Sequence, residues 1–284
     1  MKYAAMIKGV ALIGCGNIGK EIAFAVDSGR IKNASIVALF DKVKSAADEL
    51  TSKLHNNNPH IFSDFTEFIY SPSFKETHVV VEAASQDAVI NFCKKIVENG
   101  KSLIIMSVGA LADQILLSEL LNKASDNRSH IYVPTGAIAG IDAIRSVKHL
   151  IESVTLSTTK NPKALANAPF FNVARFDLFK LNQKTLIYEG NAADAVKKFP
   201  ANVNVAAVIG LAGIGIENTK VKIIADPNTD RNQHEITVNG KFGEMTISVR
   251  NIPSPANPKT SFLAVLSAIE CLRSVCDDNI RIGT

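Results

Sequence analysis

Hydrophobic and polar residues follow two different rhythms along the chain, and the rhythm changes near residue 150. In the first half, apolar runs of strand length alternate with stretches whose apolar residues recur at helical spacing. The predicted strands are 10–13, 35–40, 79–83, 102–107 and 130–133, and the predicted helices are 18–26, 86–98 and 112–123. This alternation predicts an α/β fold with a Rossmann-type, doubly wound parallel sheet.

After residue 150, apolar and polar residues alternate one by one, which is typical of half-buried strands. The predicted strands are 153–159, 185–189, 220–225, 235–238 and 244–251, with helices at 192–199 and 260–274 and a long loop over 164–177. The sequence NGKFG at 239–243 is typical of a hairpin turn. We expect an α+β domain with a mixed or antiparallel sheet over 141–256, and a dinucleotide domain over 1–140 completed by a C-terminal helix within 257–284.

The segment 10–23, VALIGCGNIGKEIA, has two possible interpretations that exclude each other. A preceding lysine, an apolar run and Cys15 resemble the cleavage site of a lipoprotein signal peptide. A signal peptide needs an apolar core of about 7–15 residues, and the run between Lys8 and Gly14 is shorter than that. We therefore favour the second interpretation, a dinucleotide-binding loop.

The same letters contain G-x-G-x-x-G between an apolar strand and a helix, and a second strand ends at Asp41. The glycines permit a tight turn, close approach of the backbone to a pyrophosphate, and close helix packing. The loop residues expected to contact the cofactor are Gly14, Gly16, Asn17, Ile18 and Gly19. Asp41 is expected to bind the ribose hydroxyls, which favours NAD, whereas Lys42 and Lys44 leave NADP open.

Composition narrows the class of protein. Of 284 residues, 46% are hydrophobic and 20% charged, which is typical of a globular chain. The net charge of +4 is too small and too scattered to indicate nucleic-acid or membrane binding. Cys15, Cys93, Cys271 and Cys276 lack metal-site spacing, so we expect buried thiols and no metal. The apolar run 203–216 is shorter than the about 20 residues of a membrane span, so we expect a buried element and a cytoplasmic protein.

Small and polar residues follow three predicted strands, as EAAS at 82–85, SVGA at 107–110 and PTGA at 134–137. Ligands of doubly wound sheets bind at the carboxyl ends of the strands. We therefore expect a flat cofactor ring and a small substrate here, with Ala84 in contact with the cofactor. Ordinary turn chemistry remains the alternative for any one of these segments.

His234 is the candidate acid/base residue of the second domain, in the segment DRNQHEI at 230–236. Histidine titrates near neutral pH and can take a proton as a hydride leaves the substrate. A histidine in a surface turn is the plain alternative. The other five histidines are interpreted as structural or solvated.

Three cationic or polar segments are candidate partners for a substrate carboxylate. The segment NIPSPANPKTSFL at 251–263 predicts a helix that begins at Pro258, where Lys259 and Thr260 could bind an anion. A plain helix cap is equally compatible with this segment. Lys160 follows a predicted strand and is either solvated or a carboxylate partner, and Arg231 is a third candidate.

In order and spacing, six segments resemble those of L-aspartate dehydrogenases, over nearly the whole chain. They are VALIGCGNIG, VVVEAAS, VPTGAIAGIDAI, FPANVNVAAVIGLAG, IIADPNTDRNQHEI and NIPSPANPKTS. The resemblance implies oxidation of L-aspartate to iminoaspartate with NAD or NADP, a step able to feed NAD biosynthesis. It also implies that His234 is catalytic and that Asn204 and Ala137 contact the cofactor. The stretch 167–177 and the tail after Arg273 depart from the family's pattern.

Iminoaspartate would hydrolyse to oxaloacetate and ammonia. Two alternatives remain: a homoserine- or dihydrodipicolinate-type oxidoreductase, and a non-catalytic NADPH-binding redox sensor. The H-H-x-x-K element of the dipicolinate enzymes is missing from the sequence. A sheet with one face uncovered by helices would be buried in a homodimer.

Overall fold

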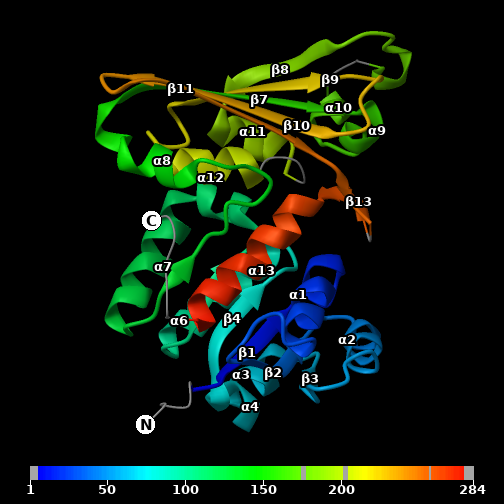
Figure 1. Cartoon of the computed structure of the whole chain (residues 1–284), viewed down its shortest axis with the longest axis vertical. Helices are drawn as coiled ribbons and strands as arrows, with labels where there is room; N and C mark the ends of the chain where they lie inside the picture. Colours follow the sequence, from blue (N-terminus) through cyan, green and yellow to red (C-terminus); the bar gives the residue numbers. More distant parts are fainter. Residues whose placement is uncertain (1–5, 174–176, 201–203, 256, 278–284) are drawn as a thin grey trace. The chain divides into compact units, whose positions relative to one another are not determined.

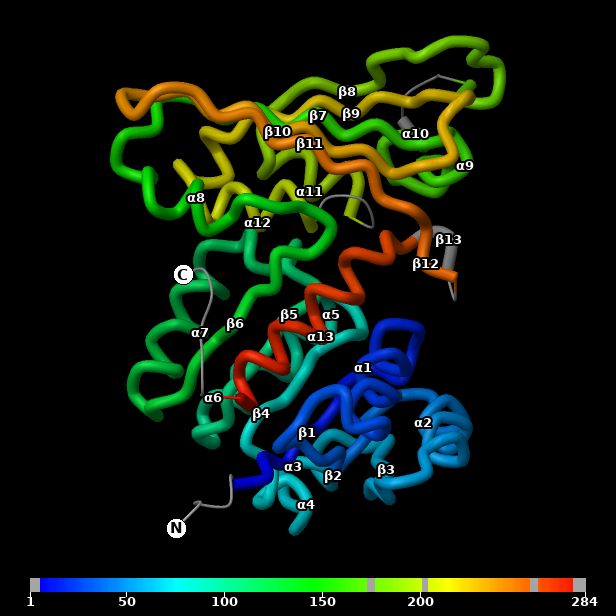
Figure 2. Tube along the Cα trace, viewed as in Figure 1, coloured from blue at the N-terminus to red at the C-terminus, as the bar shows by residue number. Residues whose placement is uncertain are grey.

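The structure is a computed structural model that describes residues 6–173, 177–200, 204–255 and 257–277. Figures 1 and 2 show the course of the chain. Contacts divide it into two compact units, Met1–Pro134 with Val265–Thr284, and Thr135–Ala264.

The first unit contains a sheet whose strands are all parallel, in the order β3-β2-β1-β4-β5-β6. The strands are β1 Lys8–Ile13, β2 Ala34–Phe40, β3 His60–Phe62, β4 Thr77–Glu82, β5 Ser102–Ile105 and β6 Ile131–Tyr132. From Val10 to Ile13 the side chains of β1 are almost completely buried, as expected for a central parallel strand covered on both faces. The predicted doubly wound fold is confirmed.

Helices connect these strands (Figure 1). They are α1 Asn17–Asp27, α2 Lys44–Thr51, α3 Phe65–Tyr70, α4 Pro72–Glu76, α5 Gln86–Ala88, a π-helical turn Val89–Cys93, α6 Lys94–Glu98, a 3₁₀ turn Val108–Ala112 and α7 Gln114–Asp126. The predicted helix 86–98 is thus continuous but contains a π turn. The sequence pattern missed β3 and α2 to α4, because these elements are short and several are half-exposed.

The second unit contains a mixed sheet in the order β11-β10-β7-β9-β8. The strands are β7 Ile151–Lys160, β8 Thr185–Asn191, β9 Thr219–Ala225, β10 Asn232–Gly240 and β11 Gly243–Asn251. Each predicted strand is present, and NGKFG forms the turn between β10 and β11. Strand β10 begins earlier than predicted, so His234 lies within it and not before it.

Helices lie against one face of this sheet (Figure 1). In this unit they are α8 Ile141–Ser146, a 3₁₀ turn Lys148–Leu150, α9 Pro162–Leu165, α10 Phe170–Val173, a 3₁₀ turn Leu178–Lys180, α11 Ala192–Lys198 and α12 Asn204–Ala212. Helices α11 and α12 both contact β9. Buried Leu156 and Ile236 lie on the same face of the sheet as buried Val221 of β9, whereas Thr155 and Thr237, their neighbours in the strands, are only half-buried. The face packed on these helices is called the inner face below.

Two sequence predictions for this part of the chain are wrong. The helix expected to begin at Pro258 begins at Phe262, as α13 Phe262–Cys276. Residues before it form β13 Asn257–Ser261, which pairs with β12 Pro253–Ser254, because backbone pairing satisfies their peptide groups instead. The segment 164–177, expected to be a loop, contains the short helix α10.

Candidate active site

The glycine loop after β1 has the shape that a dinucleotide needs. Gly14 has φ of +97°, and a Cβ there would lie 2.7 Å from the carbonyl oxygen of Ala83. A Cβ on Gly19 would collide with the carbonyl of Gly14. Next to Gly16, in contrast, no described atom lies within 4 Å of the position that a Cβ would take. The first and third glycines therefore allow close packing, and the second leaves open space for a ligand.

The helix that follows can receive a phosphate. α1 begins at Asn17, directly after Gly16, and no side chain of the described residues caps its first turn. Its N–H groups therefore remain available, and helix N-termini with such groups bind pyrophosphates. Asn17 and Ile18, two predicted cofactor residues, belong to this turn.

A hollow of about 140 Å³ lies beside the loop. It brings together the predicted cofactor residues Gly14, Asp41 and Ala84. One carboxylate oxygen of Asp41 accepts the N–H of Cys15 at 2.7 Å, and the other accepts the N–H of Val43 at 2.8 Å. The ammonium of Lys42 lies 5.7 Å from the centre of the Phe92 ring, another residue of the hollow. The hollow thus lies beside the glycine loop and has the carboxylate of Asp41 at its edge.

His234 lies on the inner face of the second unit's sheet and is 2% exposed. Its Nδ1 lies 3.1 Å from Oγ1 of Thr158, the residue opposite it on β7. Burial, and secondly the charge of Lys160, lower the pKa of His234 to about 3. The imidazole is therefore neutral at neutral pH, the form that can accept a proton.

Lys160, the last residue of β7, is 7% exposed, so its interpretation as a solvated side chain is wrong. Burial lowers its pKa to about 8. Because the inner face alternates along β7, Thr158 and Lys160 lie on the same face as His234. The strand ends thus place a cation and a neutral imidazole on one face.

Two buried asparagines, missed from the sequence, lie in the same region. Asn232 lies two residues before His234 in β10 and therefore on the same face of the sheet. Its side-chain amide donates to Oγ of Ser261 at 3.3 Å. Asn251, opposite Asn232 on β11, donates to the carbonyl of Ala137 at 2.8 Å. The signal for these residues is the group of polar side chains at one end of an otherwise apolar sheet face. This group becomes visible only when the pairing of the strands is known.

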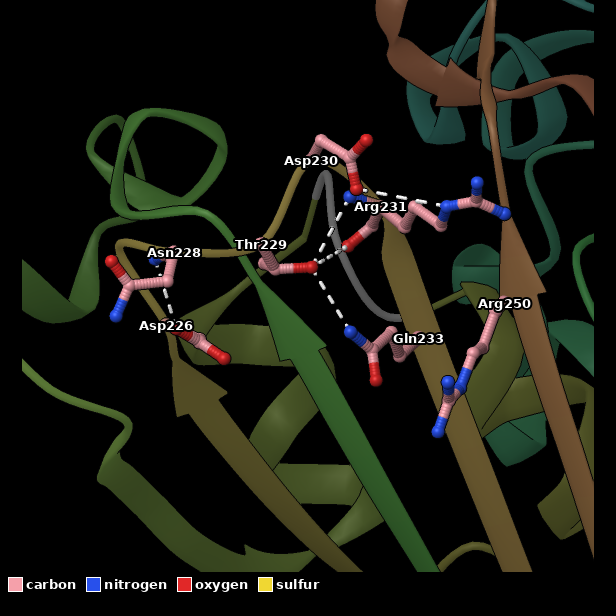
Figure 3. Close-up of a pocket in the computed structure, with 7 residues that line it drawn as sticks. All are labelled: Asp226, Asn228, Thr229, Asp230, Arg231, Gln233 and Arg250. Atoms are coloured by element: carbon pink, nitrogen blue, oxygen red, sulfur yellow. Dashed lines mark hydrogen bonds and ion pairs between the residues drawn. The ribbon is translucent and has the colours of Figure 1, made fainter.

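The remaining predicted residues are placed differently. Arg231 borders an open, polar hollow (Figure 3), where its Nε lies 3.6 Å from a carboxylate oxygen of Asp230. Lys259 and Thr260 both lie in β13 and not at a helix start. The side chain of Lys259 is not among the described parts of the structure. The helix start at Pro258, on which the candidate anion site depended, is therefore wrong. Asn204 is the exposed first residue of α12.

Other site classes find no support in the described part of the chain. The cysteines are free, with Cys15, Cys93 and Cys276 buried and Cys271 half-buried. Among those residues, acidic side chains, histidines and cysteines form no group that could hold a metal ion. None of the helices in the described ranges is long and apolar enough to cross a membrane.

Comparisons with known proteins agree with this arrangement. Residues 142–275 match the family model of the aspartate dehydrogenase C-terminal domain, and 14–134 match the NAD-binding domain of homoserine dehydrogenase. L-aspartate dehydrogenases of Nitrosopumilus maritimus and Methanosarcina barkeri are 46% and 47% identical, with 98% and 97% of this chain and 100% and 99% of theirs covered.

A solved structure extends the match to the whole fold. The crystal structure of aspartate dehydrogenase from Thermotoga maritima has a TM-score of 0.75 and 30% identity, with 97% of this chain and 99% of that chain covered. Both the sequence and the fold of this chain therefore match along nearly the full length, and the chain belongs to the L-aspartate dehydrogenase family.

Proposed function

We propose that this chain oxidises L-aspartate to iminoaspartate with NAD or NADP, and that iminoaspartate then hydrolyses to oxaloacetate and ammonia. The observation that carries the proposal is the near full-length identity of 46% with a curated L-aspartate dehydrogenase. The open glycine loop and the buried, neutral His234 supply the two functions that this chemistry requires.

The first unit holds the dinucleotide in this proposal. The N–H groups at the start of α1 bind the pyrophosphate, and Asp41 accepts hydrogen bonds from the adenosine ribose. Ala84 lines the same hollow. Ala137 and Asn204 are further proposed contacts, which the family resemblance alone implies. A nicotinamide held by these residues would supply the acceptor for the hydride that leaves the Cα atom of the substrate.

His234 accepts the proton that the substrate amine must release. Its pKa of about 3 belongs to a buried ring beside a cation, and such a ring is a weak base. A substrate with two carboxylates would compensate the charge of Lys160 and raise the pKa of His234 towards the range of an effective base. Binding of aspartate therefore activates the histidine in this proposal.

Lys160 binds a substrate carboxylate. With a pKa of about 8, its ammonium is mostly protonated at neutral pH, and a buried cation is a strong partner for a carboxylate. Arg231 is a weaker candidate, because it lies at an open surface and already pairs with Asp230. Thr260 is also weaker, because it lies in β13 and not at a helix start.

The test measures NADH formation from NAD with L-aspartate, L-homoserine and L-glutamate as separate substrates. We expect absorbance of NADH with L-aspartate alone. The variant His234→Ala should bind NADH as the wild type does and lose most turnover, whereas His149→Ala, an exposed histidine of the same unit, should stay active. Turnover of homoserine would favour the reductase alternative, and nucleotide binding without any turnover would favour a sensor.

Preference between the two dinucleotides depends on Asp41 in this proposal, because a carboxylate repels the 2′-phosphate of NADP. Asp41→Ala should therefore shift the ratio of the NAD and NADP dissociation constants towards NADP. An unchanged ratio would show that Asp41 does not contact the ribose.

We further propose that the enzyme is a cytoplasmic homodimer whose product feeds NAD biosynthesis. The face of the second unit's sheet opposite to α11 and α12 carries half-buried Thr155, Ser157 and Thr237, suited to pairing with a second copy. Light scattering should give twice the chain mass, and a monomer would contradict the dimer. Restored growth of a cell lacking its own aspartate oxidation step would support the metabolic role.

A further inference from the structure

Glu82, the last residue of β4, is a fully buried carboxylate of the first unit. Its Oε1 accepts the N–H groups of Ala84 at 2.9 Å and of Ser85 at 3.0 Å, and also the hydroxyl of Ser107 at 2.8 Å. Its Oε2 accepts the N–H of Ser107 at 2.9 Å. Burial raises the pKa of Glu82, and these four donors counteract that effect.

The donors lie where the backbone pairing of the sheet ends. Ala83 still donates its N–H to Ile13 at 2.8 Å, and Met106 donates to the carbonyl of Glu82 at 3.0 Å. The next amides along each segment, those of Ala84 and Ser107, have left the ladder. The side chain of Glu82 accepts them and so joins the segments that follow β4 and β5.

One of these segments forms a wall of the nucleotide hollow. Ala84 and Ser85 line it together with Gly14 and Asp41. The carbonyl of Ala83 is so close to Gly14 that only glycine fits there. Ser85 also caps α5, because its hydroxyl accepts the N–H of Ala88 at 3.2 Å. Displacement of residues 83–85 would therefore change both the glycine loop and the hollow.

We propose that Glu82 is a positioning residue for the dinucleotide: its carboxylate holds the segment 83–85 in the shape that receives the cofactor. The inference rests on the dinucleotide binding of the proposed function. An apolar side chain would fill the same space at a lower desolvation cost. We therefore infer that the buried carboxylate and its four donors are needed to fix the conformation of the segment 83–85.

The test uses Glu82→Gln, which keeps the size of the side chain and replaces one acceptor oxygen by an NH₂ group facing N–H donors. We expect the dissociation constant of NADH, measured by its fluorescence in the full-length protein, to rise by roughly tenfold, because charge-assisted hydrogen bonds are lost. KM for NAD should rise similarly, while KM for L-aspartate and kcat stay within about twofold. A merely structural role would lower the active fraction, and hence kcat, instead.

Two further variants make the result decisive. Glu119→Gln, on the exposed face of α7, is the matched control and should leave the NADH dissociation constant unchanged. Ser107→Ala removes one donor and keeps the carboxylate, so it should weaken NADH binding by a smaller factor; it carries the test if Glu82→Gln does not fold. A wild type that binds no dinucleotide would overturn the proposed function itself. Normal NADH binding by Glu82→Gln, or by Ser107→Ala where it alone folds, would overturn this inference alone.

Discussion

His234 and Lys160 are ionisable side chains buried on the inner face of a sheet whose other members are largely aliphatic. Burial of such groups costs free energy, and apolar side chains could fill these positions without that cost. The pairing of β10 with β7 places Thr158 opposite His234 and brings Lys160 to the same end of the sheet. The arrangement is therefore better explained by chemistry than by stability.

The buried imidazole should make the fold sensitive to acid. The pKa of His234 is about 3 in the folded chain and about 6.5 in an unfolded chain, so the unfolded state binds the extra proton first as pH falls. Stability is therefore lost between pH 6.5 and 3. When the pH is lowered from 7 to 4, the unfolding free energy should fall in both proteins. The fall should be larger in the wild type than in His234→Asn, by on the order of 3 kcal/mol.

Urea unfolding of both proteins at the two pH values measures this difference. His149→Asn is the control, since that ring is exposed and its replacement should leave the acid sensitivity of the protein unchanged. Equal losses of stability in wild type and His234→Asn would show that the ring is not buried in the neutral form.

Lys160→Met should separate binding from stability. Removal of the cation should raise KM for L-aspartate by on the order of 100-fold, as expected when one partner of a buried charge pair is lost. The unfolding free energy at pH 7 should not fall, because methionine needs no desolvation of a charge. Steady-state kinetics and urea unfolding test both parts, with Lys241→Met, an exposed lysine of the hairpin turn, as control. An unchanged KM would exclude Lys160 from substrate binding.

At the scale of elements, one-by-one alternation of apolar and polar residues predicted all five strands of the mixed sheet in the second unit, β7 to β11, because the two faces of that sheet are buried to different extents. Periodicity did not separate β13 from a helix start at Pro258, since Asn-Pro followed by polar residues suits either. The partner strand β12 decides the outcome, and pairing is not visible in one segment. For the same reason His234 was predicted as a candidate, whereas Thr158, which faces it, was not.

The strand–turn–helix element around Gly14 allows a matched pair of substitutions. Gly14 and Gly29 both have positive φ, of +97° and +74°, but only at Gly14 would a Cβ meet other atoms, whereas at Gly29 none of the described atoms lies within 4 Å. Gly29→Ala should cost about 1–2 kcal/mol of unfolding free energy and leave NADH affinity unchanged. Gly14→Ala should cost more and weaken NADH binding by at least about tenfold, because the backbone must move away from Ala83. Equal effects of both substitutions on NADH binding would contradict close packing at Gly14.

At the scale of the whole molecule, the nucleotide-binding unit is built from both ends of the chain. After the second unit, the chain returns through α13, whose side chains Ile269, Leu272 and Cys276 are buried. The ammonium of Lys8, at the start of β1, donates to the carbonyl of Val275 at 2.7 Å. A strand that leads into the glycine loop is thus tied to a segment more than 250 residues away in the sequence.

This discontinuity predicts that a substitution near the end of the chain weakens the nucleotide unit. Leu272 is fully buried, so Leu272→Ala should lower the unfolding free energy by about 2–5 kcal/mol through a cavity in that unit. Because a ligand stabilises only the state that binds it, saturating NADH should restore part of the lost stability. Urea unfolding with and without NADH measures both effects, and Leu121→Ala, an exposed leucine of α7, is the control. If Leu272→Ala unfolds like the control, α13 does not belong to the core of the nucleotide unit.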